Sequence, residues 1–349
     1  MSQSQFLSNC TADAMRDAAA TLAVGNLVAF PTETVYGLGA DACNGDAIAR
    51  IYSVKGRPSD HPLIVHVTSM QRMGDWAEDI PEYAIKLARD FWPGPMTLVL
   101  KRSSLAQDFI TGGQETVGVR VPDHAVARAL LEAFENIGGK GIAAPSANRF
   151  GQVSPTTAEA VAEELGEYLD FADQIIDGGA CAVGVESTII DCTGNAPRIL
   201  RHGAITAAMI ETSAGIQLGG SLPHLVEDLN NITVFEQSET MVYELQEAIR
   251  VSGSLESHYA PAARVLLDQD PIAGQGFIAL ADRPTPIGVF RIASPVDVEE
   301  FARVLYAALR QADSDGLIEV VVGQPAGEGI AIAIRDRLTK AQNGRKTQK

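Results

Sequence analysis

The sequence predicts an α/β protein with two domains, a larger N-terminal one built on a twisted sheet and a smaller C-terminal one. Two observations predict this fold class. Short apolar runs of strand length alternate with segments of helical periodicity along most of the 349 residues. A stretch rich in Gly and Ser interrupts this alternation once, and a chain of this length suits two hydrophobic cores better than one.

The N-terminal domain is expected over residues 1–210. It begins with an alanine-rich helix over 12–24, in which Met15, Ala18 and Leu22 recur at helical spacing. The strand-like runs that follow are NLVAF (26–30), PLIVHV (62–67), MTLVLKR (96–102), VGVRVP (117–122), GIAAPSAN (141–148) and ESTIIDCT (186–193). The helical runs between them are DAIARIYSVKGR (46–57), PEYAIKLARDFW (81–92), HAVARALLEAF (124–134) and TTAEAVAEELG (156–166).

Residues 211–262 change in composition and are expected to form a linker or a lid segment, with one helix over 238–250. Strand and helix patterns resume over 263–340, which predicts a small three-layer, Rossmann-like α/β domain. Its strand-like runs are RVLLD (264–268), GFIALA (276–281), PIGVF (286–290) and LIEVVVG (317–323), and its helices are expected over 298–313 and 329–342. A flexible tail is expected over 341–349.

Composition and charge exclude several classes of protein. Hydrophobic residues make up 46% and charged residues 20%, as in ordinary globular proteins. No apolar run approaches the roughly 18 residues of a membrane span, and the N-terminus has no secretory signal pattern, so a cytoplasmic protein is expected. Four dispersed cysteines fit a reduced compartment. A net charge of −17 disfavours broad electrostatic binding of nucleic acid, although a few cations could still converge on one anionic ligand.

The first candidate site segment is FPTETVYGLGADA (30–42), where an apolar strand ends in polar residues. Polar loops after buried strands are where α/β proteins bind ligands. The segment offers the side chains of Thr32, Glu33, Thr34 and Tyr36 but no lysine.

Four basic or titratable positions follow. Lys55 and Arg57 share a turn made stiff by Gly and Pro in KGRPSDHPL (55–63), so both could converge on a polyanion, or both could be solvated. His66 in its strand fits a core histidine at least as well as a ligand. Arg120 lies in an apolar strand and needs an anionic partner, either a structural carboxylate or the carboxylate of a ligand.

Two further segments carry hydroxyl and amide groups. APSANRFGQVSPT (144–156) contains Ser146, Asn148, Ser154 and Thr156, which suit a base, a ribose or phosphate oxygens. The same residues also fit an ordinary turn with a helix N-cap at Thr156 or Thr157. In addition, Ser187 lies in VESTIID (185–191) and Arg201 precedes a glycine in RILRHG (198–203).

Several well-known catalytic motifs are missing from the sequence. It contains no P-loop, no GxGxxG after the first strand, no GxSxG and no HExxH. Scattered cations and hydroxyls without a nucleophile or a metal cage suit a site that orients two substrates and neutralises phosphate charge.

Six motifs occur in a fixed order along the chain: FPTETVYGLGADA, KGRPxxxPLIVHV, FWPGPMTLVL, VGVRVPDH, APSANRFGQVSPT and VESTIID. With them, the chain resembles the YrdC-like family of L-threonylcarbamoyladenylate synthases over about residues 15–205. SGSLESHYAP followed by a small α/β domain resembles the long form of that family. The resemblance implies a YrdC-like open sheet with a concave cleft. It implies a nucleotidyltransferase that converts L-threonine, bicarbonate and ATP, with Mg²⁺ carried mainly by ATP and water, into threonylcarbamoyl-AMP and pyrophosphate. A separate tRNA threonylcarbamoyl transferase complex would consume this product.

The resemblance also implies roles for individual residues. Lys55 and Arg57 are expected to be catalytic, because they would stabilise charge on the phosphates. Threonine is expected to bind Thr32, Thr34, Tyr36, His66, Arg120 and Ser187. ATP is expected to bind Lys55, Arg57, His61, Thr116, Ala144, Ser146, Asn148, Ser154, Thr156, Arg201, His258 and Tyr259, with the last two closing over it as a lid.

The chain departs from the family pattern at two places. His61 replaces the usual asparagine before the Pro-Leu pair, and Leu255, Glu256 and Ser257 stand where the linker often has basic residues. Two rival functions also stay open at this point. One is an RNA-binding or ribosome-assembly factor without turnover, which the acidic composition disfavours, and the other is carbamoyl transfer to another acceptor.

Overall fold

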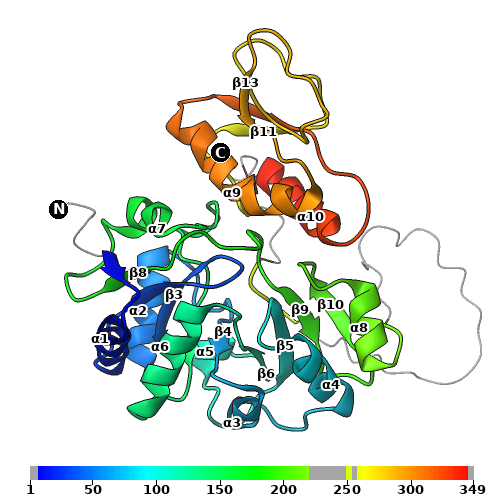
Figure 1. Ribbon diagram of the computed structural model, residues 1–349. Coiled ribbons are helices and arrows are strands. Elements are labelled where there is room, and N and C mark those ends of the chain that lie inside the picture. The colour runs from blue at the N-terminus through cyan, green and yellow to red at the C-terminus, as the bar shows by residue number, and fades with distance from the viewer. Residues whose placement is uncertain (1–6, 220–248, 254–257, 345–349) are drawn as a thin grey trace, which may run out of the picture.

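The computed structural model describes residues 7–219, 249–253 and 258–344 (Figure 1). The helix expected over 238–250 lies almost wholly outside the described residues, and Leu255, Glu256 and Ser257 lie outside them too. The described residues form a ten-stranded sheet and a separate four-stranded sheet. These two sheets confirm the predicted division into two α/β units.

The ten-stranded sheet is mixed, with the spatial order β1-β8-β2-β3-β7-β4-β6-β5-β9-β10. Neighbours are parallel in β1–β8, β8–β2, β4–β6 and β5–β9, and antiparallel elsewhere. The strands are β1 (Leu7–Asn9), β2 (Val28–Pro31), β3 (Tyr36–Asp41), β4 (Ile64–His66), β5 (Met96–Lys101), β6 (Thr116–Arg120), β7 (Ile142–Ala143), β8 (Gln174–Asp177), β9 (Thr188–Asp191) and β10 (Arg198–Arg201).

Helices cover both faces of this sheet. α1 and α6 contact each other on one face, where they enclose Phe30 and Ile176, while α2 and α7 cover the opposite face around Ala29 and Leu38. The helices of this part of the chain are α1 (Ala12–Ala23), α2 (Gly45–Lys55), α3 (Met73–Trp76), α4 (Glu82–Phe91), α5 (Asp108–Thr111), α6 (Ala125–Asn136), α7 (Ala158–Leu165) and α8 (Ala207–Ala214), with a 3₁₀ turn over Met70–Arg72.

The helix ends follow the local chemistry of the sequence. The side chain of Asn44 accepts hydrogen bonds from the first turn of α2, and Gly56 ends that helix in a left-handed conformation. Thr157 caps α7 by accepting a hydrogen bond from the Ala160 amide, so of the two cap positions expected from the sequence it is Thr157 that caps the helix.

The strand β3 corrects the expected polar loop of the first site segment. Residues 36–41 form a buried strand, and the loop is confined to the four residues between β2 and β3. Gly39 permits this because a Cβ there would lie 2.8 Å from the side chains of Phe30 and Ile142. Alternating glycines hid the strand from a pattern search, since Gly is a poor strand former.

The four-stranded sheet is all parallel, in the order β11-β14-β12-β13, and consists of β11 (Arg264–Leu267), β12 (Gly276–Ile278), β13 (Phe290–Ala293) and β14 (Glu319–Val322). The helices α9 (Val298–Ser314) and α10 (Ile330–Asn343) contact each other and cover one face. On the other face Phe277 lies beneath the guanidinium groups of Arg283 and Arg291, so a loop forms the third layer.

Two boundaries expected in the C-terminal part are wrong. PIGVF contributes only Phe290 to β13, because Pro286 and the left-handed Gly288 hold its first residues in a turn. The flexible tail cannot begin at residue 341, because α10 continues to Asn343 and buries Ala341.

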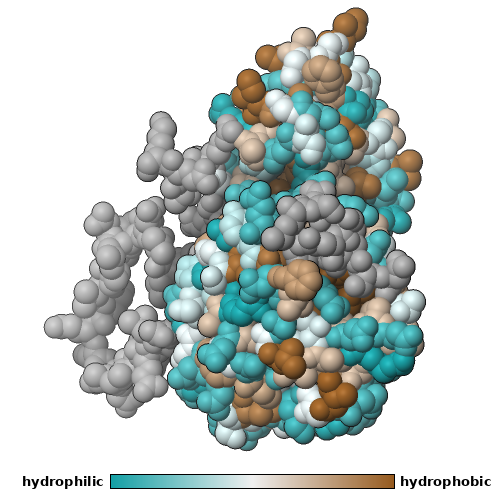
Figure 2. All heavy atoms as spheres, turned by 90° about the vertical axis from the view of Figure 1, so that its left-hand side faces the viewer, coloured by the Kyte–Doolittle hydropathy of each residue, from teal (hydrophilic) through white to brown (hydrophobic). Residues whose placement is uncertain are grey.

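The surface view shows hydrophobic side chains scattered among hydrophilic ones, with several at the top over the C-terminal sheet (Figure 2). Exposed apolar residues of this region are Ile272, Ile287, Phe290, Val296 and Ile318. In the described part of the chain, every helix is too short or too polar to span a bilayer.

Candidate active site

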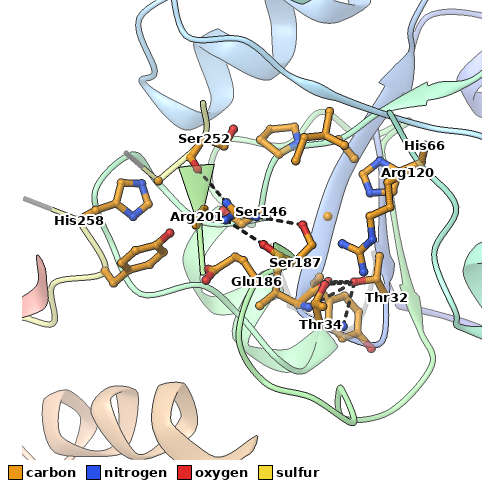
Figure 3. A pocket seen from close by; sticks show the side chains of 18 of the residues that line it. Thr32, Thr34, His66, Arg120, Ser146, Glu186, Ser187, Arg201, Ser252 and His258 are labelled. Carbon is orange, nitrogen blue, oxygen red and sulfur yellow. Dashed lines mark hydrogen bonds between the residues drawn. The ribbon is translucent and has the colours of Figure 1, made fainter. Parts of the chain in front are cut away.

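One cavity collects most of the residues singled out from the sequence (Figure 3). The space between its lining atoms amounts to about 540 Å³, part of it open to solvent. Its lining consists of Thr32, Thr34, Val35, Tyr36, Gly37, Arg57, Ile64, His66, Arg120, Ala144, Pro145, Ser146, Glu186, Ser187, Arg201, Ser252, Gly253, His258 and Tyr259. All six residues expected to bind threonine and six of the twelve expected to bind ATP are among them.

The sheet topology brings these side chains together from distant parts of the sequence. His66 and Arg120 are the last residues of β4 and β6, and they are paired in register because the two strands are parallel. Carboxyl ends of adjacent parallel strands meet at one edge, which is where open α/β sheets bind ligands. Thr32 and Thr34 lie in the β2–β3 connection on the same side of the cavity (Figure 3).

The two threonines form a small hydroxyl cluster. Thr32 Oγ1 and Thr34 Oγ1 lie 2.8 Å apart, and Thr32 Oγ1 also donates to the Val35 carbonyl at 2.7 Å. Tyr36 also lines the cavity, but its hydroxyl donates to the Gly179 carbonyl at 2.8 Å. The Tyr36 hydroxyl therefore holds the 178–179 turn, whereas Thr32 and Thr34 line the cavity.

The sequence argument left open whether Arg120 pairs with a structural carboxylate or with a ligand. In the structure its partner is a structural carboxylate, that of Glu33. Arg120 Nη2 lies 2.7 Å from Glu33 Oε1, and both side chains are at least nine-tenths buried. In addition, Arg120 Nε donates to the Gly94 carbonyl at 3.3 Å. The carboxylate of Glu33 makes no hydrogen bond within the described residues, so the ion pair with Arg120 is its main compensation. The sequence argument noted Glu33 in the first site segment but gave it no role.

The opposite side of the cavity carries two further guanidinium groups. Arg201 donates to the Ser187 carbonyl at 3.1 Å and to the Ser187 hydroxyl at 3.0 Å. Ser252, in the described segment 249–253, contacts the guanidinium groups of both Arg57 and Arg201. Its hydroxyl accepts a hydrogen bond from Arg57 at 3.1 Å, and its carbonyl accepts one from Arg201 at 2.8 Å. The sequence argument gave Ser252 no role, although Ser252 is the first residue of the SGSLESHYAP segment.

His258 and Tyr259 close this side of the cavity. Their rings are 4.1 Å apart, His258 contacts Phe150 edge-on at 6.1 Å, and both residues are buried. Tyr259 adopts a left-handed backbone conformation, with φ of 62°. His258 Nδ1 and the Tyr259 hydroxyl have no hydrogen-bond partner among the described residues, although each is buried. Buried polar atoms without partners are costly, which favours a ligand that satisfies them.

Six residues expected to bind ATP do not line the cavity, and two of them have clear roles in the protein itself. Lys55 is buried and donates to the carbonyls of Ser146, at 2.6 Å, and of Asn148. Ser154 donates to Glu186 Oε1 at 2.6 Å. Lys55 and Ser154 thus shape the loop that lines the cavity, and their direct contact with ATP stays a prediction.

The other four lie around the cavity. Asn148 donates to the carbonyls of Arg149 and Gln152, while Thr156 is buried. Thr116 lines a smaller neighbouring cavity. His61 lies 5.4 Å from the Phe150 ring, edge to face. The expected contacts of these residues with ATP also stay predictions.

Positively charged side chains predominate in the cavity lining, which contains three arginines and one carboxylate. Burial lowers the pKa of Arg57 to about 10 and also lowers the pKa of Arg201, because both charges have lost part of their hydration. Burial and the neighbouring Arg120 lower the pKa of His66 to about 3, so the imidazole is neutral at pH 7. Desolvated guanidinium groups gain most from an anionic ligand, so the cavity can bind carboxylate and phosphate groups.

Glu186 is the carboxylate that the described residues bring to the cavity lining. Burial alone would raise its pKa, but Arg337 and Arg201 lower the pKa to about 2, so it is ionised. Both of its oxygens accept hydrogen bonds from protein groups. Nowhere in the described ranges do three or more His, Cys, Asp or Glu side chains gather in a way that could hold a metal ion.

Two family models match consecutive parts of the chain. The model described as "Telomere recombination" matches residues 20–203, and the model described as "Threonylcarbamoyl-AMP synthase, C-terminal domain" matches residues 205–342. The first range contains β2 to β10 of the ten-stranded sheet, and the second contains the whole four-stranded sheet.

Relatives and solved structures match the chain over nearly its whole length. The chain is 39% identical to the threonylcarbamoyl-AMP synthase of Pyrococcus abyssi, covering 95% of this chain and 94% of the relative. It is 36% identical to that of Bacillus subtilis, covering 94% and 92%. The crystal structure of P. abyssi Sua5 complexed with L-threonine superposes with a TM-score of 0.81, at 36% identity and over 97% and 98% of the two chains. The chain therefore belongs to the threonylcarbamoyl-AMP synthase family, in the form that carries the additional C-terminal domain.

Proposed function

We propose that this protein forms L-threonylcarbamoyl-AMP and pyrophosphate from L-threonine, bicarbonate and ATP. The observation that carries the proposal is one cavity in which hydroxyls beside a buried arginine face a second group of arginines. The names of its full-length relatives support the same reaction. The product would then be used by a separate complex that modifies tRNA.

Threonine would bind on the side of Thr32, Thr34, His66 and Arg120 (Figure 3). Arg120 is fixed by Glu33 and by the Gly94 carbonyl, so its guanidinium is already oriented for the carboxylate of an amino acid. The hydroxyls of Thr32 and Thr34 suit the side-chain hydroxyl of the substrate. A neutral His66 can donate or accept one hydrogen bond without repelling the substrate ammonium.

ATP would bind on the side of Arg57, Ser146, Arg201 and His258. Two buried guanidinium groups there can neutralise phosphate oxygens. The contacts of Arg57 and Arg201 with Ser252 use neutral acceptors, which a phosphate can replace with a stronger charge-assisted partner.

In the proposed reaction the protein orients both substrates and forms no covalent bond with either. The threonine amine attacks CO₂ derived from bicarbonate and gives a carbamate with loss of a proton. A carbamate oxygen then attacks the α-phosphorus, and the bond to pyrophosphate breaks. Arg57 and Arg201 would stabilise the charge that develops on the phosphates, and Lys55 would support them by fixing the loop at Ser146.

Mg²⁺ would enter with ATP as part of the substrate. The Glu186 carboxylate is already engaged by protein donors on both oxygens, so it is not free to serve as a protein ligand. Phosphate oxygens and water would therefore provide most of the coordination, as is common for Mg²⁺ at nucleotide sites. The ion would offset phosphate charge and help to orient the leaving group.

The test is an assay of pyrophosphate release with ATP, Mg²⁺, L-threonine and bicarbonate, together with mass spectrometry of the product. We expect release only when all four are present. We expect Arg57→Ala to lower turnover by roughly 100-fold or more while changing threonine affinity little, because one catalytic charge contact contributes about 3 kcal/mol. Lys55→Ala should also lower turnover more than threonine affinity.

Arg89→Ala provides the matched control, because Arg89 is an exposed arginine on α4 whose ion-pair partner is its neighbour Asp90, at 3.8 Å. Its turnover should equal that of the wild type. Unchanged turnover in Arg57→Ala would refute the proposed role of that residue. RNA retention that depends on salt, without any pyrophosphate release, would replace the synthase with the RNA-binding alternative.

A further inference from the structure

The C-terminal domain packs directly on the side of the cavity where ATP would bind. α9 and α10 lie between the four-stranded sheet and the larger domain (Figure 1). Val35, Val153 and Val185 from the larger domain share one hydrophobic cluster with Phe301 and Leu305 of α9. The interface is therefore a continuous apolar core, and the polar groups that cross it are held in fixed positions.

Glu186 is the point at which the two domains meet at the cavity. Ser154 donates to Glu186 Oε1 at 2.6 Å from the larger domain. From the C-terminal domain, the Tyr306 hydroxyl donates to Glu186 Oε2 at 2.9 Å and Arg337 Nε donates to the same oxygen at 2.8 Å. We refer to Glu186, Ser154, Tyr306 and Arg337 as the Glu186 junction.

The Glu186 junction also supports the lid residue Tyr259. The Tyr306 ring stacks on the Tyr259 ring at 5.8 Å, and the Arg337 guanidinium lies 5.2 Å from the centre of the same ring. Arg337 is 1% exposed and also donates to the His202 carbonyl at 3.0 Å. A guanidinium this deeply buried requires paired carboxylates, and Arg337 has two: Glu186 at its Nε and Asp336 at its Nη1.

α10 makes a second contact with the segment that enters the cavity. Lys340 Nζ donates to the Gly253 carbonyl at 2.8 Å, next to the Ser252 groups that accept from Arg57 and Arg201. One helix of the C-terminal domain thus holds Glu186, Tyr259 and Gly253 at the same time.

We propose that the C-terminal domain sets the affinity for ATP through the Glu186 junction, with Arg337 and Tyr306 as positioning residues for the nucleotide. The inference rests on the function proposed above. Without Arg337, the Glu186 carboxylate would stay in the cavity without its main counter-charge. It would then compete with phosphate for Arg57 and Arg201, and the Tyr259 ring would lose its contact with the Arg337 guanidinium.

The experiment measures the Kd of Mg–ATP and of L-threonine, each alone, by titration calorimetry on the full chain. We expect Arg337→Met to raise the Kd of ATP by about tenfold or more and the Kd of threonine by less than about twofold, since only the ATP side loses charge compensation. Tyr306→Phe keeps the ring stack and removes one hydrogen bond, so an increase of about three- to fivefold is expected.

A double variant separates charge compensation from a merely structural role. Glu186→Gln removes the charge that Arg337 compensates, so Arg337→Met/Glu186→Gln should bind ATP more tightly than Arg337→Met, within about fivefold of the wild type. Arg335→Met is the matched control, because Arg335 lies on the same helix but donates to the carbonyls of Pro325 and Gly327. It should bind both substrates like the wild type.

The outcomes are decisive in each case. An unchanged Kd of ATP in Arg337→Met, or a double variant no better than the single one, would overturn the inference. Should Arg337→Met fail to fold, Tyr306→Phe carries the test, and an unchanged Kd there overturns it. A wild-type chain that binds neither substrate would overturn the proposed function and the inference together, whereas tight wild-type binding with unchanged variants would overturn the inference alone.

Discussion

Replacing Arg120 by methionine should damage the protein in two separable ways. The Arg120 and Glu33 side chains are 5% and 8% exposed, with a nitrogen–oxygen distance of 2.7 Å. Removing one partner of a buried ion pair costs about 3–5 kcal/mol, because the remaining charge is left without compensation. For a domain of about 200 residues this lowers the melting temperature by roughly 6–20 °C. Threonine binding should also weaken by roughly 10- to 150-fold with the loss of a charge-assisted contact of about 1.5–3 kcal/mol.

The double variant Arg120→Met/Glu33→Met separates these two effects. Replacing both members of a buried ion pair with apolar side chains is often neutral or stabilising, so most of the lost stability should return. Threonine affinity should stay as low as in the single variant, because no guanidinium is present to meet the carboxylate. Urea denaturation without ligand measures the first quantity and calorimetric titration with L-threonine measures the second. Recovery of threonine binding in the double variant, or full stability in the single one, would refute this reasoning.

Three further predictions follow from single positions. A Cβ at Gly253, where φ is +80°, would lie 2.2 Å from the Tyr259 hydroxyl. Gly253→Ala should therefore raise the Kd of ATP by about tenfold through ~1–2 kcal/mol of strain. An unchanged Kd of ATP would contradict this prediction. Thr34→Val keeps the shape but loses a hydroxyl, so calorimetry should show threonine affinity about fivefold lower and ATP affinity unchanged. Burial lowers the pKa of His66 and of His258 to about 3. Below pH 6.5 each of these histidines therefore binds a proton more readily in the unfolded chain than in the folded one. Each histidine should lower the free energy of unfolding by about 2 kcal/mol between pH 7 and pH 5. Urea titrations that give equal stability at both pH values would count against this prediction.

Much of the cavity could be predicted from the sequence because its residues stand next to strand ends. His66 and Arg120 follow apolar runs that are clearly strands, and parallel pairing places the ends of such strands side by side. The arginine in an apolar strand signalled an anionic partner by itself, since burial of an unpaired guanidinium is costly. The sequence did not say whether that partner was Glu33 or a ligand, because that choice depends on the position of the β2–β3 connection.

The residues that were missed depend on contacts far apart along the chain. Glu186 stands next to Ser187 in a recognised segment. A carboxylate in a cavity for anions is explained only by its counter-charge Arg337, which contacts it in space but is 151 residues away in the sequence. The role of Lys55 was likewise hidden, because its bonds to the carbonyls of Ser146 and Asn148 arise from tertiary packing. Periodicity and motif spacing describe local structure and carry no information on such pairings.

The position of α10 has a consequence for protein synthesis. Arg337 and Lys340 lie in the last helix that the structure describes, so the ribosome makes them after every strand of the ten-stranded sheet. A nascent or truncated chain that stops before this helix would contain all the arginines of the cavity but lack the groups that fasten Glu186 and Gly253. Such a chain should bind ATP more weakly than a chain that includes α10.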